Sequence, residues 1–370
     1  MNILYSCLSQ SWGGMELFAL TALKQLQNRG HDVELICYKD SRIHKEAISM
    51  VIQTHPFRFF SYFHPLQVRK LKRILKRGEY DLIHTQFSKD LFLIIPAVKL
   101  ARLNIPVFLT KQVGSYIVKK DFIHKWIYKR LTCAFAISEV IRKNLLDTCP
   151  LDISKIRLLH NGVDTVKFNP HMSNREKIRN EYNIGADDLV MGMLARFSPG
   201  KGHEEFLEAA RELCGNYKHL KFMIVGEASR GEDEYADHIK KMANDYIPGN
   251  VIFTGFRKDT PDILHAMDIF VFPSHSEAFG IALIEAMATE RASVASRTDG
   301  ILDIAIDGET SLLFEKGNAV DLKEKLETLI ENRELREKMG KAARKRTIEN
   351  FEIELLSQRV IDFYKEYLNK

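Results

Sequence analysis

Two glutamates eight residues apart, Glu277 and Glu285, have the types and spacing that most clearly indicate chemistry in this chain. They follow an apolar run at 269–272 that is typical of a buried strand, and a helix is predicted to begin near 281. A helix start after a parallel strand presents free backbone N–H groups and a positive dipole end, which together favour a phosphate. Ionised carboxylates only accept hydrogen bonds, so beside an anion site they suit hydroxyl-rich groups. A phosphate with hydroxyls indicates a sugar nucleotide, although a glutamate early in a helix is also common because it complements the dipole.

Two cations follow another predicted strand, at 190–195. Arg196 offers a planar fork of donors and Lys201 a mobile charge, and both lie in a loop rich in glycine and proline. This combination suits a diphosphate. The alternative, a surface loop with solvated cations, is disfavoured by the position at a strand end.

Three weaker motifs lie where such a fold binds ligands. Gly13 and Gly14 open the first predicted helix, so their backbone could approach a phosphate or a sugar ring, although tight turns also use glycine for steric reasons. Asn161 lies where the two halves of the chain meet, and an Asn-Gly turn is the plain alternative there. Phe256 follows the predicted strand 251–254, whose end could offer backbone groups to a base.

Both halves of the chain alternate short β-branched runs with amphipathic helical patterns. The strands predicted are 3–6, 33–37, 82–85, 107–110 and 134–138 in the first half, and 190–195, 222–226, 251–254, 269–272 and 293–296 in the second. This alternation predicts an α/β fold with two parallel, doubly wound sheets, whose ligands bind outside the carboxyl ends of the strands.

Composition limits the class of protein. With 370 residues, 45% of them hydrophobic, the chain is long enough for two domains. Five cysteines without Cys-x-x-Cys spacing predict reduced thiols in a cytoplasmic protein, with neither a metal site nor a disulfide framework. The chain start lacks the pattern of a signal peptide, and the longest apolar run, 91–98, is far shorter than the roughly 18 residues of a membrane span. We therefore expect a soluble or peripheral protein.

The net charge of +5 is unevenly distributed, since residues 1–165 carry 25 Lys and Arg against 13 Asp and Glu. Basic residues interleave with apolar and aromatic ones at 69–77 and 119–130, a composition typical of a surface that meets anionic lipid head groups. A solvated basic helix face is the alternative. Nucleic acid is not expected as a partner, because no nucleic-acid-binding motif accompanies the charge.

Taken together, these motifs resemble the retaining glycosyltransferases of family 4, and the resemblance extends over essentially the whole chain. The Glu-x7-Glu element with the Arg and Lys loop is its specific part. The elements that match in order and spacing are Gly13-Gly14, Asp81-Leu82-Ile83-His84, Asn161-Gly162-Val163-Asp164, Arg196 with Lys201-Gly202, Gly255-Phe256, and Glu277 through Glu285-Ala286-Met287-Ala288.

The resemblance implies the GT-B fold, in which two Rossmann-like domains face a central cleft. It implies an acceptor-binding domain at 1–165, a nucleotide-sugar-binding domain at 166–350, and a helix at 351–370 that packs back on the N-terminal domain. The apolar spacing of that last segment is helical and requires a partner surface.

The resemblance also implies a role for each matching residue. Glu285 binds the ribose hydroxyls of the donor and Glu277 lies by the donor sugar. Arg196 and Lys201 neutralise the diphosphate, and Arg196, Lys201 and Glu277 form the catalytic group. The remaining substrate-binding residues are Gly13, Gly14, His84, Gln112, Asn161, Phe256 and the backbone N–H groups around Phe279, Gly280 and Ile281.

The reaction implied is metal-independent transfer of a hexose from a nucleoside diphosphate to an acceptor hydroxyl with retained configuration, and no cofactor is expected besides this donor. Front-face attack is implied, with the departing phosphate taking the acceptor's proton, so Glu277 is not a nucleophile. A cell-envelope glycan, such as lipopolysaccharide core or a lipid-linked glycan, would suit the basic first half. The protein would then lie in the cytoplasm, peripheral to the inner face of the membrane, with an anionic membrane surface as a further partner.

Some positions depart from the family pattern. Gln112 occupies the place of a frequent histidine, and glutamine cannot take up a proton near neutral pH. Gln86 likewise replaces a second histidine, Thr289-Glu290 replaces a common Cys-Gly pair, and the loop 225–229 lacks the usual second glycine. These changes concern the contacts to the acceptor and to the donor sugar rather than the nucleotide site.

Two other classes of protein remain open. A nucleotide-sugar epimerase can share this architecture and would form product without an acceptor. A non-catalytic protein would bind the donor without turnover, although the two glutamates together with the two cations argue against it. A nicotinamide dehydrogenase is disfavoured, because neither half opens with Gly-x-Gly-x-x-Gly followed by an acidic residue.

Overall fold

The computed structural model describes residues 1–58, 64–172, 174–229 and 231–369. The chain divides into two compact units. Unit 1 comprises Met1–Asn161 and Glu354–Lys370, and unit 2 comprises Gly162–Ile353. Among the described residues, no helix has the length and apolar character that crossing a membrane requires.

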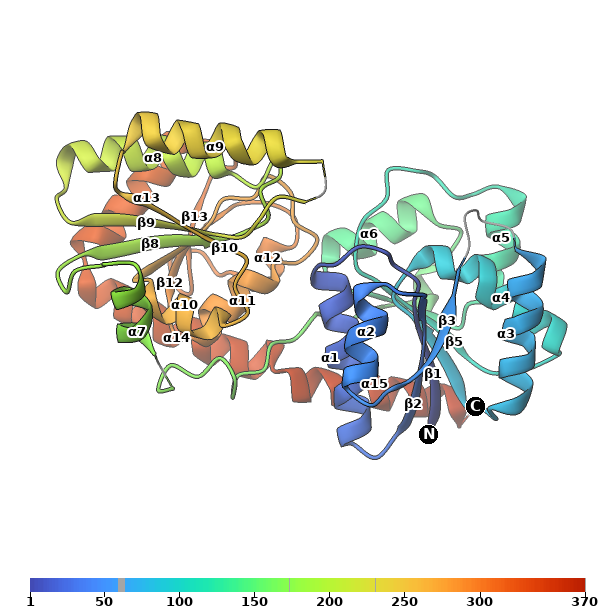
Figure 1. Ribbon diagram of the computed structural model, residues 1–370. Coiled ribbons are helices and arrows are strands. Elements are labelled where there is room, and N and C mark those ends of the chain that lie inside the picture. The colour runs from blue at the N-terminus through green and yellow to red at the C-terminus, as the bar shows by residue number, and fades with distance from the viewer. Residues whose placement is uncertain (59–63, 173, 230, 370) are drawn as a thin grey trace. The chain divides into compact units, whose positions relative to one another are not determined.

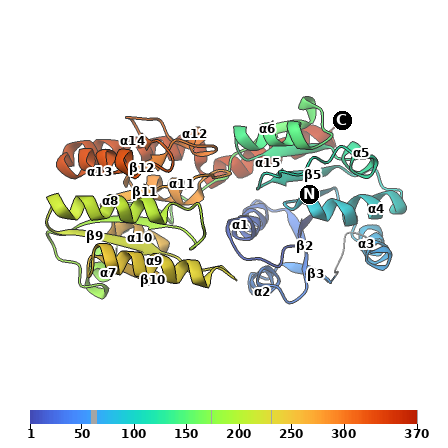
Figure 2. The ribbon, with the colours of Figure 1, turned by 90° about the horizontal axis from the view of Figure 1, so that it is seen from above.

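Unit 1 is built on a parallel seven-stranded sheet with the order β3-β2-β1-β4-β5-β6-β7. Its strands are β1 (Asn2–Cys7), β2 (Asp32–Tyr38), β3 (Gln53–Phe57), β4 (Leu82–Thr85), β5 (Val107–Lys111), β6 (Cys133–Ala136) and β7 (Ile156–Leu158). Its helices are α1 (Gly14–Asn28), α2 (Arg42–Ser49), α3 (Pro65–Arg77), η1 (Ser88–Asp90), α4 (Leu91–Ala101), α5 (Phe122–Lys129), α6 (Glu139–Thr148), η2 (Ile153–Lys155) and α15 (Ile353–Leu368). Helices α1, α2 and α15 pack on one face of the sheet, and α3, α4 and α5 lie together on the other (Figure 2).

Unit 2 is built on a parallel six-stranded sheet with the order β10-β9-β8-β11-β12-β13. Its strands are β8 (Leu189–Leu194), β9 (Leu220–Val225), β10 (Val251–Gly255), β11 (Ile269–Phe272), β12 (Ala292–Ser296) and β13 (Leu312–Phe314). Its helices are α7 (Arg175–Glu181), α8 (His203–Asn216), α9 (Asp233–Tyr246), α10 (Thr260–Ala266), α11 (Ile281–Ala288), α12 (Ile301–Ile304), α13 (Ala319–Glu331) and α14 (Arg333–Phe351). Helices α8 and α9 cover one face, and α10, α11 and α14 cover the other (Figure 1).

The prediction of two doubly wound parallel sheets is confirmed. In each sheet the strand order reverses once, between β1 and β4 in unit 1 and between β8 and β11 in unit 2. Ligands of open α/β sheets bind outside the carboxyl ends of the strands at this reversal. A ligand site is therefore expected in the loops that follow these four strands.

Three strands were not predicted from the sequence, namely β3, β7 and β13. All three lie at a sheet edge. Strand β3 is mostly polar, and β7 and β13 have only three residues each, too few to show the periodicity that predicts a strand. Strand β3 even contains Pro56. An edge strand tolerates proline because the backbone N–H groups on its outer side form no hydrogen bonds with another strand.

The C-terminal helix α15 packs on the core of unit 1. Tyr364 is fully buried and its ring lies 5.0 Å from that of Phe108, while Ile361 is also buried in the same cluster. The extended residue Glu352 separates α14 from α15, and its strand-like neighbour is Val163. The chain therefore enters and leaves unit 2 through two adjacent segments.

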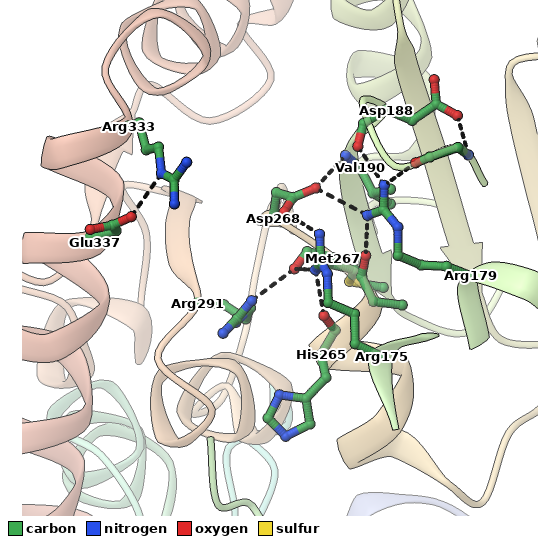
Figure 3. Close-up of polar contacts among 12 residues, drawn as sticks. Arg175, Arg179, Asp188, Val190, His265, Met267, Asp268, Arg291, Arg333 and Glu337 are labelled. Atoms are coloured by element: carbon green, nitrogen blue, oxygen red, sulfur yellow. Dashed lines mark hydrogen bonds and ion pairs between the residues drawn. The ribbon is translucent and has the colours of Figure 1, made fainter. Parts of the chain in front are cut away.

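A polar network of arginines around Asp268 holds the amino ends of β8 and β11 (Figure 3). The carboxylate of Asp268 accepts hydrogen bonds from Arg175 Nη2 at 2.7 Å and from the backbone N–H of Val190 at 2.8 Å, and Arg179 lies 3.5 Å away. Arg179 is only 5% exposed, and its guanidinium also donates to backbone carbonyls. These cations stabilise the edge of the sheet opposite to the strand carboxyl ends.

Candidate functional site

The loops after β8 and β11 are fixed against each other in unit 2. Gly202 has φ +80°, and a Cβ at this position would lie 2.2 Å from the carbonyl oxygen of Pro273. The backbone N–H of His275 donates to the carbonyl of Gly200 at 2.9 Å. Only glycine allows both this left-handed conformation and this close approach. The Lys201-Gly202 pair is therefore held beside the loop that carries Glu277.

Lys201 and Glu277 form an ion pair at this junction. Lys201 Nζ donates to Glu277 Oε2 at 2.8 Å, and the two side chains are 23% and 22% exposed. An ammonium group has three N–H donors, so further donors remain for an incoming anion. The pair thus offers a cation for a phosphate and a carboxylate acceptor for hydroxyl groups.

The loop after β12 positions Glu277. Asp299 Oδ2 accepts hydrogen bonds from Ser276 Oγ at 2.6 Å and from the backbone N–H of Glu277 at 3.3 Å. The N–H of Gly300 donates to the carbonyl of Glu277 at 3.0 Å, and a Cβ on Gly300 would lie 2.4 Å from the carbonyl oxygen of Ala278. Neither Asp299 nor Gly300 was predicted from the sequence, although an Asp-Gly turn after the strand predicted at 293–296 was the available signal.

Helix α11 begins beside this ion pair. Its N-cap, Gly280, has φ +121°, which a residue with a side chain rarely adopts. The first N–H groups of a helix have no intrahelical acceptor, so Ile281 and its neighbours can bind an anion. The side chain of Phe279 is buried, with its ring 5.8 Å from that of Phe351, so this side chain is not available to a ligand.

Glu285 lies one turn into α11 and is partly buried. Burial raises the pKa of its carboxyl to about 7, and Lys167 opposes this shift. A carboxyl group with a pKa of about 7 changes charge in the physiological range. Its affinity for hydroxyl groups should therefore depend on pH.

Arg196 is exposed, and its guanidinium faces the loop after β9. Arg196 Nη1 donates to Ser229 Oγ at 2.7 Å. Ser198 Oγ, in the same loop as Arg196, donates to Glu232 at 2.5 Å, and this bond is the main cause that lowers the pKa of Glu232, with Arg196 contributing. In this state Arg196 is engaged away from the Lys201–Glu277 pair.

The loops after β9 and β10 adjoin the loop of Arg196. Gly226 has φ +145°, and a Cβ on it would lie 2.0 Å from the carbonyl oxygen of Ala195. The N–H of Gly226 donates to the carbonyl of Gly255 at 3.0 Å, and the next residue, Phe256, is 44% exposed. An exposed aromatic ring at a strand end can stack on a planar group.

In unit 1, the Gly13-Gly14 turn follows β1 and leads into α1. Gly13 is extended, with φ −176°, and a Cβ on it would approach only Glu16 Oε2, at 3.8 Å. The steric explanation for a glycine therefore does not apply at Gly13. A side chain at Gly13 would make only an ordinary contact with Glu16, so the backbone there is not closely packed.

Two of the predicted substrate-binding residues of unit 1 contact each other. Gln112 and Asn161 exchange amide hydrogen bonds of 3.1 and 2.9 Å at the carboxyl end of β5. Gln112 also donates to Gln86 at 3.5 Å, and Gln86 donates to the hydroxyl of Tyr5. These amides lie at the strand ends where a ligand of unit 1 would bind.

His84 in β4, which was also predicted to bind the substrate, lies inside the core of unit 1. Its ring stacks on Tyr5 at 4.9 Å, its Nδ1 contacts the hydroxyl of Tyr364, and its Nε2 lies 2.8 Å from Thr110 Oγ1. Burial lowers its pKa to about 3. Both ring nitrogens are used within unit 1, so the structure supports a role for His84 in packing α15 onto the sheet.

Two buried carboxylates that sequence analysis missed lie near the end of β1. Asp90 accepts hydrogen bonds from Ser6 Oγ at 2.6 Å and from the N–H of Leu8 at 3.1 Å, and burial raises its pKa to about 7. Glu16 is 2% exposed. One oxygen of each carboxylate, Asp90 Oδ1 and Glu16 Oε1, has no hydrogen-bond partner among the described residues. No group of three or more His, Cys, Asp or Glu side chains suited to a metal occurs in the described part of the chain.

Two family models match this chain. The model of "Glycosyltransferase Family 4" matches residues 12–167, and that of "Glycosyl transferases group 1" matches residues 174–346. The first match lies in unit 1 and in the first residues of unit 2, and the second lies in unit 2.

Curated relatives carry the names of glycosyltransferases. The chain is 27% identical over 65% of its length to the capsular polysaccharide biosynthesis glycosyltransferase CapM of Staphylococcus aureus, and this match spans 63% of CapM, less than two thirds of that relative. It is 25% identical over 96% of its length, and over 97% of the relative, to the N,N'-diacetylbacillosaminyl-diphospho-undecaprenol alpha-1,3-N-acetylgalactosaminyltransferase of Campylobacter jejuni.

Solved structures share the fold. A glycosyltransferase from Rickettsia africae has a TM-score of 0.90 and 23% identity, covering 99% of this chain and 98% of its own. The Anabaena protein HepE, in complex with UDP and glucose, has a TM-score of 0.84 and 22% identity, covering 99% of both chains.

Proposed function

Because the chain belongs to glycosyltransferase family 4 and has the GT-B fold, we propose that it transfers a hexose from a nucleoside diphosphate to an acceptor hydroxyl with retention of configuration. The observation that carries the proposal is the Lys201–Glu277 ion pair beside the amino end of α11, at the strand-order reversal of unit 2. A cation, a helix start and a carboxylate acceptor are the groups that a sugar diphosphate needs.

Unit 2 binds the donor in this proposal. The diphosphate lies between Lys201 and the first N–H groups of α11, and Glu285 accepts hydrogen bonds from the ribose hydroxyls. Arg196 leaves Ser229 and donates to the diphosphate, a change that its exposure allows. HepE, a neighbour of the same fold, binds UDP.

The bond between the anomeric carbon and the diphosphate oxygen breaks, and the acceptor oxygen bonds to the same face of that carbon. The acceptor proton passes to the departing diphosphate. Lys201, Arg196 and the α11 dipole oppose the negative charge that grows on this leaving group, a contribution that usually dominates such catalysis. In this proposal these positive charges take the place of a metal ion.

Glu277 positions the donor sugar. Its carboxylate is oriented by Lys201 and its loop by Asp299. In the double displacement of retaining glycosidases a carboxylate attacks the anomeric carbon instead. Trapping a covalent sugar on Glu277 with a fluorinated donor would overturn the positioning role.

We assign acceptor binding to unit 1, at the carboxyl ends of β1, β4 and β5. The backbone of Gly13 is not closely packed, Gln112 and Asn161 place a pair of hydrogen-bonded amides at these strand ends, and Glu16 offers an unpartnered buried oxygen. The relatives named above act in capsular polysaccharide biosynthesis and on a diphospho-undecaprenol-linked sugar. A cell-envelope glycan, such as lipopolysaccharide core or a lipid-linked glycan, is therefore the proposed acceptor, and the cytoplasmic face of the membrane the proposed location.

The test is turnover of a panel of nucleotide sugars with and without undecaprenyl-linked and lipopolysaccharide-core acceptors. We expect one donor to release its nucleotide slowly alone and faster with an acceptor, and NMR of the product to show the donor's anomeric configuration. An altered sugar formed without acceptor would identify an epimerase. Binding of a donor without turnover under any condition would identify a non-catalytic protein.

A further inference from the structure

Exposed apolar side chains are concentrated in one short segment of unit 1. Seven of the twenty large hydrophobic residues exposed in the described part of the chain lie within residues 113–126. These seven are Val113, Tyr116, Ile117, Val118, Phe122, Ile123 and Trp126. Tyr116 and Phe122 are 102% and 82% exposed. A contiguous exposed apolar patch on a protein marks a surface that meets a partner.

Polar contacts, and not apolar burial, hold the 113–126 segment. Ser115 exchanges two hydrogen bonds of 2.9 Å with the side chain of Asn144 in α6, and the N–H of Lys119 donates to the carbonyl of Thr148 at 2.6 Å. Asp121 caps α5 by accepting from the N–H groups of Ile123 and His124. The segment therefore has a defined conformation that presents its apolar side chains to solvent.

The surroundings of the segment are basic. Residues 113–130 contain five Lys and Arg and a single acidic residue, Asp121, which serves as the α5 cap. Lys99 of α4 lies over the ring of Trp126, 4.0 Å from its centroid. Helix α3 packs on α4 on the same side of the sheet and carries six Lys and Arg without an acidic residue (Figure 2).

This combination of positive charge and apolar surface favours an anionic bilayer over a second copy of the chain as the partner. A second copy of the chain bound through the same face would bring these lysines against their own equivalents, which like-charge repulsion disfavours. Aromatic and aliphatic side chains flanked by lysines are instead typical of segments that lie in the interface of an anionic bilayer.

We propose that the 113–126 segment, with the basic residues of α3, α4 and α5 around it, docks the protein on an anionic lipid bilayer. Tyr116, Phe122 and Trp126 lie at the level of the head groups, and the lysines contact lipid phosphates. This inference rests on the proposed function, because a lipid-linked acceptor would be presented from the same surface.

Flotation with vesicles of phosphatidylcholine, with and without phosphatidylglycerol, tests the proposal. We expect the wild-type protein to float only with the anionic vesicles. Replacing three lysines (Lys119→Gln, Lys120→Gln, Lys125→Gln) should weaken binding by roughly a hundredfold, because each lysine near an anionic surface contributes about fivefold to the affinity and the three factors multiply. The double variant Tyr116→Ser/Phe122→Ser should also lose binding. The control variant Ile48→Ser/Ile153→Ser removes two other apolar side chains of unit 1, which are 55% and 59% exposed, and it should float as the wild type does.

Any of three results would refute the docking surface. These are failure of the wild-type protein to bind vesicles, equal binding with and without phosphatidylglycerol, and binding of the Tyr116→Ser/Phe122→Ser variant as strong as that of the wild type. Transfer to a short, water-soluble acceptor separates this result from the proposed function. A wild-type protein that transfers sugar to that acceptor but does not float refutes only the surface. A protein that floats but turns over no donor refutes only the proposed function.

Discussion

Glu285 provides a pH-dependent test of donor binding. Its carboxyl has a pKa of about 7 without ligand, and only the ionised form can accept hydrogen bonds from two ribose hydroxyls with both oxygens. If binding requires the ionised form, the apparent Kd rises by the inverse of the ionised fraction. That fraction is about one tenth at pH 6 and about nine tenths at pH 8, so UDP should bind about tenfold more weakly at pH 6.

The assay is calorimetric titration with UDP, the nucleotide bound in the HepE structure, between pH 6 and pH 8. The nucleotide's own phosphate titrates near pH 6, so Glu285→Gln is the matched control. We expect the variant to bind more weakly at pH 8 and to show a smaller change with pH than the wild type. Parallel pH profiles for the two proteins would refute the assignment of Glu285 to the ribose.

The same shift has a consequence for stability. A carboxyl pKa raised in the folded state means that the folded protein binds more protons than the unfolded one between about pH 4.3 and 7. The free energy of unfolding therefore falls as pH rises through this window. Glu285→Gln should stabilise the protein by about 1–3 kcal/mol at pH 8 and leave it nearly unchanged at pH 4, as measured by urea unfolding.

Three further substitutions separate catalysis, loop positioning and stability. Lys201→Ala should lower kcat by about 10²-fold, because it removes a cation that stabilises the negative charge on the leaving group. The control variant Lys240→Ala, at an exposed surface position, should leave steady-state kinetics unchanged. Equal rates for both variants would count against a catalytic role of Lys201. Asp299→Ala should lower kcat while the stability of the fold changes little, because the loop of Glu277 loses two hydrogen bonds. Asp299→Asn should recover part of the rate, because the asparagine can accept one of these two bonds. Equal rates for the two variants would argue against a role of Asp299 in positioning the loop. Asp268→Ala should lower the free energy of unfolding by about 3 kcal/mol, because it leaves the buried Arg179 and the half-buried Arg175 without their carboxylate. A variant as stable as the wild type in urea would show that the network contributes little.

The central part of the fold could be predicted from the sequence. The predicted strands belong to β1, β2, β4, β5 and β6 of unit 1 and β8 to β12 of unit 2, because buried parallel strands are continuous apolar runs. The edge strand β3 is mostly polar and contains a proline, and the edge strands β7 and β13 have only three residues each, too few to show a pattern. Their pairing is decided by contacts with a neighbouring strand, which local sequence does not encode.

The candidate site could be predicted only to the level of the sheet edge. Strand ends placed the loops of Lys201 and Glu277 at one edge, and the structure joins these side chains although 76 residues separate them. The partners of Arg196 and the burial of Glu285 depend on side-chain rotamers and on how α11 packs, which a motif does not specify. Asp299 and Asp90 act by hydrogen bonds to the backbone, a role with only a turn signal or none in the sequence.

The proposed function requires that unit 2 binds a sugar diphosphate where the loops after β8 and β11 meet. A crystal structure with UDP tests it most directly. We predict the diphosphate within hydrogen-bond distance of Lys201 Nζ and of the first N–H groups of α11, with the ribose hydroxyls on Glu285. A nucleotide bound at the amino ends of the strands, near Asp268, or in unit 1 would refute this donor site.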